Sequence, residues 1–178
     1  YVPSHELKGP AGKTFYLNHH AVKHKKKGKF RVVFNAAAKT GGLSLNDAIV
    51  PGPDLLERIV GILLRFRRFF IAVCADIKAF YLQVKTAPAD RDMHRFLWYK
   101  NGIPGNELVD LRMTVHMFGG TASGPCSMVA RDRSIDDAAA SGVIDVEQGE
   151  RLKRDFYSDD LLKSFEDERV ARKEMDDA

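Results

Sequence analysis

The apolar positions of the chain follow a helical period in some stretches and a strand-like pattern in others. After Pro53-Asp54, leucine, isoleucine and valine recur at helical spacing with arginines largely on the opposite face, which predicts a helix from about residue 54. The run FFIAVCADI, residues 69–77, follows it. Its continuous aromatic and β-branched character predicts a buried strand, and that strand ends at Asp76.

The same patterns predict two hairpins, three more helices and two loops. Residues 15–34 read as a hairpin with a lysine-rich tip, and residues 96–99 with 108–115 read as a second hairpin. Helices are expected from Cys126 to about Ala140, from about Asp145 to Lys153, and from Glu166 onward. Residues 1–13 and 35–50 are expected to be loops. The mixture predicts an α+β fold.

Composition places the chain among ordinary globular proteins. With 178 residues and 44% hydrophobic content, it is long enough for one domain with its own core. The longest apolar stretch, residues 69–75, is too short for a membrane span, and no charged leader opens the chain. We therefore expect an intracellular, cytoplasmic protein with no membrane partner. Cys74 and Cys126 lack metal-ligand spacing and are predicted to be small core residues.

The net charge of +4 hides an asymmetry along the chain. Residues 1–50 hold 9 Lys and Arg against 2 Asp and Glu, whereas residues 101–178 hold 10 against 17. A basic lobe suits a polyanion such as nucleic acid, because Lys and Arg neutralise phosphates. An acidic lobe that works beside the same polyanion would need cations.

Two groups of carboxylates invite a chemical interpretation. Asp76 is charged at the end of an apolar strand, where it needs a hydrogen bond, an ion pair or a metal. Capping of a helix that begins at Ile77 and metal binding are both open alternatives. The adjacent Asp159 and Asp160, in RDFYSDDLLKSF, are either solvated turn residues or like charges that a partner must compensate.

Taken in chain order, these pieces resemble a reverse transcriptase. The order is a basic hairpin with RVVF, a strand with ADIKAFYLQV, a Phe-Gly loop and FYSDD. The phrases FRVVFNAAAKT, SLNDAI, ILLRFR, VHMFGG and FYSDDLLKSF resemble most closely the polymerase of Pao/BEL-type long-terminal-repeat retrotransposons. The resemblance runs from about Tyr16 to Ala178.

The resemblance implies the fingers and palm of a right-hand polymerase, with an antiparallel palm sheet that carries helices on one face. Residues 1–53 would be an N-terminal loop and fingers hairpin, 54–85 the first palm segment with the catalytic strand, 86–118 fingers, and 119–178 palm with the YSDD hairpin. The thumb is expected to be missing, as is any RNase H region of the parent polyprotein.

The implied activity is that of an RNA-directed DNA polymerase, which adds dNTPs to a primer 3′-OH on an RNA or DNA template. The resemblance makes Asp76, Asp159 and Asp160 catalytic, and together with Ile77 it assigns them to two Mg²⁺ ions, for which Mn²⁺ is a possible substitute. Such a site requires the Asp76 strand and the FYSDDLL hairpin to be neighbours in one antiparallel sheet.

The nucleotide is expected to contact residues from several segments. Arg31 resembles the arginine that binds the triphosphate, and Lys29 is chosen from among the hairpin lysines as its partner. Tyr81 resembles the aromatic gate that rejects a 2′-OH, with strand packing as the alternative. The backbone of Gly120 would lie under the nucleotide or template. Ile77 completes the nucleotide-binding set.

The sequence departs from the family pattern at Asn35, at Ser158 and in the length of the loop 118–125, none of which removes a metal ligand. A second hypothesis remains open: a catalytically inactive, nucleic-acid-binding remnant of a retroelement. The resemblance also makes retrotransposon particles an alternative location.

Overall fold

The computed structural model describes residues 2–23, 25 and 28–176, and these fall into two compact units. The first contains Tyr1–Gly52 and Tyr81–Ser123, and the second contains Pro53–Phe80 and Gly124–Ala178. These divisions lie close to the expected boundaries after residues 53, 85 and 118. The assignment of the units as fingers and palm stays a prediction.

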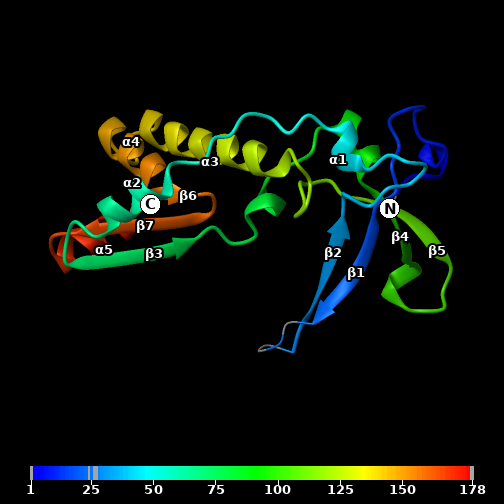
Figure 1. The fold of residues 1–178 in the computed structure, drawn as a ribbon, viewed down its shortest axis with the longest axis horizontal. Helices are drawn as coiled ribbons and strands as arrows, with labels where there is room; N and C mark the ends of the chain where they lie inside the picture. The colour runs from blue at the N-terminus through cyan, green and yellow to red at the C-terminus, as the bar shows by residue number, and fades with distance from the viewer. Residues whose placement is uncertain (1, 24, 26–27, 177–178) are drawn as a thin grey trace. The chain divides into compact units, whose positions relative to one another are not determined.

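The first unit contains two antiparallel strand pairs, visible in Figure 1. Strand β1 (Asn18–Lys23) pairs with β2 (Phe30–Asn35), and β4 (Arg95–Tyr99) pairs with β5 (Leu108–Arg112). Both predicted hairpins are therefore confirmed. Of the lysine-rich tip, Lys26 and Lys27 lie outside the described residues.

The expected loop 35–50 contains a short helix, α1 (Leu45–Ala48). Its start is fixed by a reciprocal cap: the Asp47 amide donates to the Ser44 hydroxyl at 3.1 Å, and the Ser44 amide donates to the Asp47 carboxylate at 3.0 Å. The first unit also contains 3₁₀ turns, which are η1 (Ser4–Glu6), η3 (Pro88–His94) and η4 (Lys100–Gly102), while η2 (Phe80–Gln83) spans the division between the units.

The core of the first unit combines an apolar cluster with a buried charge network. Leu17, Ala36, Leu45 and Met117 form the cluster. Arg95, the fully buried first residue of β4, donates to the Asp92 carboxylate at 2.9 Å and to the carbonyls of Glu6 and Leu7 at 2.6 and 2.7 Å. These bonds hold the N-terminal loop against β4. The loop thereby gains the packing contacts that it lacks by itself.

The charge network also sets the ionisation of its carboxylate. Burial raises the pKa of Asp92, but hydrogen bonds from Arg112 and Arg95 outweigh burial and hold this pKa below its ordinary value. Asp92 is therefore kept charged beside the two guanidinium groups.

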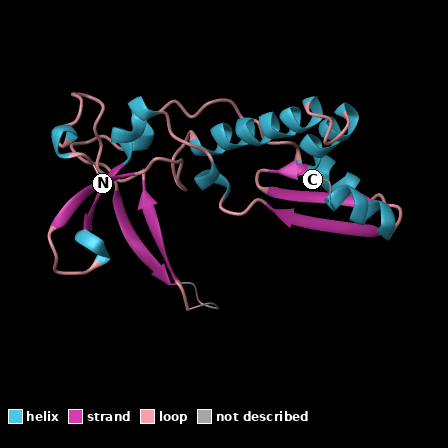
Figure 2. Ribbon diagram, turned by 180° about the vertical axis from the view of Figure 1, so that it is seen from behind, coloured by secondary structure: helices cyan, strands magenta, loops and turns pink. Residues whose placement is uncertain are grey.

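The second unit is built on one three-stranded antiparallel sheet of order β3-β7-β6. The strands are β3 (Ile71–Asp76), β6 (Phe156–Tyr157) and β7 (Asp160–Phe165). Its helices, cyan in Figure 2, are α2 (Ile59–Phe66), α3 (Ser123–Ala140), α4 (Val146–Asp155) and α5 (Glu168–Asp176). The structure is thus of the mixed α+β class, and the predictions of the last three helices are confirmed.

The two faces of this sheet have different surroundings. Leu161 and its strand partner Phe156 form a buried cluster with Ile135 of α3 and Ile144, against which Leu152 of α4 and Met175 of α5 pack. Because successive strand residues face opposite sides, Ser164 lies on the other face, where its hydroxyl donates to the Arg65 carbonyl of α2 at 2.8 Å. The expectation of helices on one face therefore holds for α3, α4 and α5 but not for α2.

Three expectations were wrong: the start of helix α2, the burial of strand β3 and the burial of the two cysteines. Helix α2 begins at Ile59 rather than near residue 54, and an Asp54 carboxylate that accepts from the Leu56 amide at 3.1 Å favours a turn there. Strand β3 is an edge strand, so its residues are half-buried or exposed instead of buried. Cys74 on β3 and Cys126 in the first turn of α3 are exposed, not core residues.

In the part of the chain that the structure describes, no helix combines the length and apolar character of a membrane span.

Candidate metal centre at the paired ends of β3 and β7

The structure brings the aspartates of the second unit together at one end of its sheet. Asp76, the last residue of β3, is the direct cross-strand partner of Asp160, the first residue of β7. Directly opposed residues of an antiparallel pair have Cα atoms about 4.5–5.5 Å apart, and their side chains share a face. The Ile77 amide donates to the Asp159 carbonyl at 3.0 Å and extends the pairing by one residue. The expected pairing of the Asp76 strand with the FYSDDLL hairpin is therefore confirmed.

A tight turn presents Asp159 beside this pair. Tyr157 and Asp160 are cross-strand partners, so Ser158 and Asp159 form a two-residue loop. Ser158 has φ of 55°, in the left-handed region that glycine usually occupies at the first position of such loops. Ala79, three residues after Asp76, also has a positive φ, 56°. Each such residue carries strain of about 1–3 kcal/mol, and strain of this kind clusters at functional sites.

The surroundings of the three aspartates differ from the expected ones. Asp76 and Asp160 are exposed and Asp159 is half-buried, so the burial that was expected to force a partner on Asp76 is absent. The alternative of helix capping also fails, because Ile77 lies outside any helix and η2 starts only at Phe80. What remains unusual about Asp76 is the like charge directly across from it.

This arrangement is unfavourable by itself and favourable for a hard cation. Like charges at directly opposed strand positions destabilise a sheet. Within the described residues, no group of three or more His, Cys, Asp or Glu side chains is placed so that it could hold a metal ion together. Mg²⁺ rarely uses a cage made of protein ligands alone, because it keeps several waters and binds through one or two carboxylates plus substrate phosphates. The opposed carboxylates of Asp76 and Asp160 are the one or two protein ligands that such an open Mg²⁺ site would use, with water and substrate phosphates to complete it.

The other expected site residues belong to the first unit, and only Ile77 lies with the aspartates. Arg31, in β2, and Lys29, just before it, are exposed. The Tyr81 ring lies edge-on to the Phe118 ring, with centroids 4.6 Å apart. Tyr81 is in the 3₁₀ turn η2 rather than in a strand, so the strand was wrongly predicted, while the alternative that the ring serves only in packing stays open. The nucleotide-binding roles of these residues stay predictions.

The loop of Gly120 is held by a residue that the sequence interpretation did not select. The Asn46 amide group donates to the Gly119 carbonyl and accepts from the Thr121 amide, both at 3.0 Å. A Cβ atom at Gly120 would lie 2.8 Å from the Ser123 hydroxyl oxygen, so a larger residue would disturb the loop. Asn46 stands in the phrase SLNDAI, so the resemblance marked its segment but not its function.

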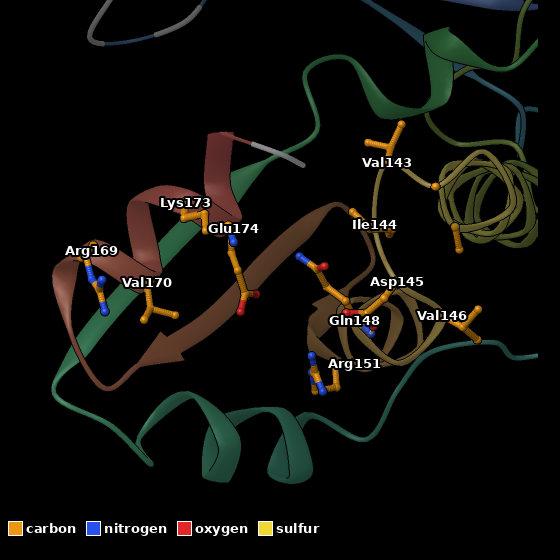
Figure 3. Close-up of a pocket in the computed structure, with 12 residues that line it drawn as sticks. Val143, Ile144, Asp145, Val146, Gln148, Arg151, Arg169, Val170, Lys173 and Glu174 are labelled. Atoms are coloured by element: carbon orange, nitrogen blue, oxygen red, sulfur yellow. Dashed lines mark hydrogen bonds between the residues drawn. The ribbon is translucent and has the colours of Figure 1, made fainter.

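The second unit also contains a hollow of about 920 Å³, and its lining includes none of these aspartates. Figure 3 shows its residues, which come from the end of α3 and the segment after it, from α4 and from α5. Three of its polar side chains are engaged: Asp145 caps α4 through the Gln148 amide at 2.6 Å, Arg151 pairs with Glu147, and Glu174 pairs with Lys163. The hollow therefore offers no cluster of reactive groups comparable to the paired strand ends.

No protein-family model matches the sequence, and none of the curated proteins matches it. Function therefore has to be inferred from the residues of this chain and their geometry.

Proposed function

We propose that this chain is the fingers and palm of a reverse transcriptase of the Pao/BEL retrotransposon type. It acts as an RNA-directed DNA polymerase, transferring nucleotides from dNTPs to a primer 3′-OH. The observation that carries the proposal is the cross-strand pair of Asp76 and Asp160, with Asp159 in the adjoining turn. A carboxylate pair that weakens its own sheet is best explained by a cation that it binds.

In this proposal, Asp76, Asp159 and Asp160 supply the carboxylate oxygens of the site. The hydrogen bond from the Ile77 amide to the Asp159 carbonyl keeps the two strand ends in register. When bound, two Mg²⁺ ions supply charge stabilisation to the attacking 3′-oxygen and to the leaving pyrophosphate. The carboxylates themselves orient and do not exchange protons, so catalysis is positioning and electrostatics.

The first unit supplies the substrate contacts in the same proposal. Arg31 and Lys29 bind phosphate oxygens of the incoming nucleotide, and the guanidinium fork of Arg31 suits them. The Tyr81 ring, held by Phe118, excludes a 2′-OH and so selects dNTPs. The excess of Lys and Arg in residues 1–50 supports an RNA or DNA template as partner. The cytoplasm or a retrotransposon particle is the proposed location.

The test is extension of a labelled primer on RNA and DNA templates, with Mg²⁺ or Mn²⁺. The 178-residue chain is assayed alone and with a polymerase thumb attached, because a thumb holds the duplex on a polymerase. Asp76→Asn and Asp159→Asn are expected to lower the rate at least about 100-fold. Glu166→Gln is the matched control, since it neutralises an exposed acid just beyond the other end of β7.

Extension at the wild-type rate by either asparagine variant would refute the proposed function. A wild-type chain that binds primer and template with steep salt dependence, yet incorporates nothing in either form, would favour the inactive remnant instead.

A further inference from the structure

Arg131 of α3 reaches the turn that carries Asp159. Its Nη1 donates to the Ser158 carbonyl at 2.7 Å, so the bond engages the peptide group directly before Asp159. The guanidinium also lies over the Phe156 ring, 5.0 Å from its centroid. Phe156 is in β6, the strand that leads into the turn. Only 7% of the Arg131 side chain is exposed. One buried side chain thus contacts both the strand that enters the turn and the turn itself.

The charge of Arg131 is balanced locally by its neighbour. Its Nε and Nη2 lie 2.9 and 2.7 Å from one oxygen of the Asp132 carboxylate. This pairing orients the planar fork and leaves Nη1 directed at the Ser158 carbonyl. A charge-assisted hydrogen bond at that carbonyl offsets the strain of a serine at φ of 55°.

We propose that Arg131 is a positioning residue that holds the Ser158-Asp159 turn and thereby sets the affinity of the aspartate site for divalent cations. The link between cation affinity and catalysis rests on the proposed function. The stabilisation of the Ser158-Asp159 turn by Arg131 does not depend on it. Arg131 acts through the Ser158 peptide. It takes no part in the chemistry itself.

The experiment compares Arg131→Met with Arg133→Met, an arginine two residues along the same helix. The Arg133 side chain is 76% exposed and pairs with Asp137 at 2.9 Å, so its loss removes an equal charge without touching the hairpin. Two properties are measured on the full chain: Mn²⁺ binding with the metal alone as probe, and hydrogen exchange of the Ile77 amide without metal. That amide reports on the turn because it donates to the Asp159 carbonyl.

Arg131→Met is expected to weaken Mn²⁺ binding about 10-fold or more, as loss of a residue that orients metal ligands usually does. It should also speed exchange at Ile77 relative to amides at the Ile71 end of β3, which distinguishes a loosened turn from general destabilisation. If Arg131→Met does not fold, Arg131→Lys gives the same comparison, because an ammonium cannot form the planar fork.

Equal Ile77 exchange and equal Mn²⁺ affinity in the Arg131 and Arg133 variants would overturn the proposal. Faster Ile77 exchange in a protein whose wild type binds no Mn²⁺ would support the hold on the turn and count against the proposed function. These outcomes therefore separate a wrong role for Arg131 from a wrong proposed function.

Discussion

Replacement of Asp76 by asparagine should stabilise the protein when divalent cations are absent. Asp76 lies directly opposite Asp160 on one face of the sheet, and both side chains are exposed. The Asp76→Asn substitution keeps the size of the side chain and removes one of the two like charges. The free energy of unfolding in EDTA should therefore rise.

The size of the effect follows from the spacing of the two strand positions. Two charges about 6 Å apart in a water-like dielectric repel by about 0.7 kcal/mol, and like charges at opposed strand positions destabilise by about 0.2–1 kcal/mol. Mg²⁺ bound at the proposed site would reverse the order of the two stabilities. At about 10 mM Mg²⁺ and a dissociation constant of about 1 mM, wild type would gain about 1.4 kcal/mol, and Asp76→Asn would gain much less.

Urea unfolding followed by circular dichroism, in EDTA and in Mg²⁺, measures both differences. Glu166→Gln controls for the loss of one negative charge elsewhere on the second unit. Trp98, the single tryptophan, lies in the first unit, so its fluorescence follows a part of the chain that carries no substitution. Lower stability of Asp76→Asn in EDTA, or equal stabilisation of both proteins by Mg²⁺, would refute the reasoning.

Three further predictions concern the buried groups and the turn. Arg95→Met should lower the free energy of unfolding by about 3–5 kcal/mol in urea titrations, because it leaves Asp92 buried without one of its cations. Burial lowers the pKa of His94, so the unfolded state takes up the proton first as the pH falls through about 6.5. The free energy of unfolding should therefore fall from that pH down to the pKa of His94 in the folded state. His94→Gln should flatten this part of the curve of stability against pH. Ser158→Gly should raise the free energy of unfolding in urea by about 1 kcal/mol by relieving its positive φ, whereas Ser134→Gly, inside α3, should lower it.

Elements whose signals are local could be predicted from the sequence. Helix α4 is an example, because Asp145 precedes it and accepts from the Gln148 amide at 2.6 Å. The two hairpins of the first unit also follow from alternating runs separated by turn residues. Burial could not be predicted in the same way. The run before Asp76 has the composition of a buried strand, but whether a strand is buried depends on its neighbours, and β3 has a neighbour on one side only.

The candidate site was likewise predicted from the sequence only in part. The adjacency of Asp76 and the YSDD turn was expected from the order of motifs that resemble a polymerase, since no local period connects segments so far apart. Arg131 and Asn46 were missed, because a side chain that binds a distant backbone carbonyl leaves no pattern in the sequence. A basic residue inside a predicted helix is ordinarily a solvated surface residue.

In the proposed function, Asp76 and the Ser158-Asp160 turn bind the same divalent cation. The most direct measurement is the paramagnetic broadening of backbone amide NMR signals during addition of Mn²⁺ to wild type and to Asp76→Asn. We expect the signals of Ile77, Ser158, Asp159 and Asp160 to broaden first in wild type and to persist in Asp76→Asn at the same Mn²⁺ concentration. Broadening that centres on other acidic residues, or that is unchanged by Asp76→Asn, would contradict this expectation.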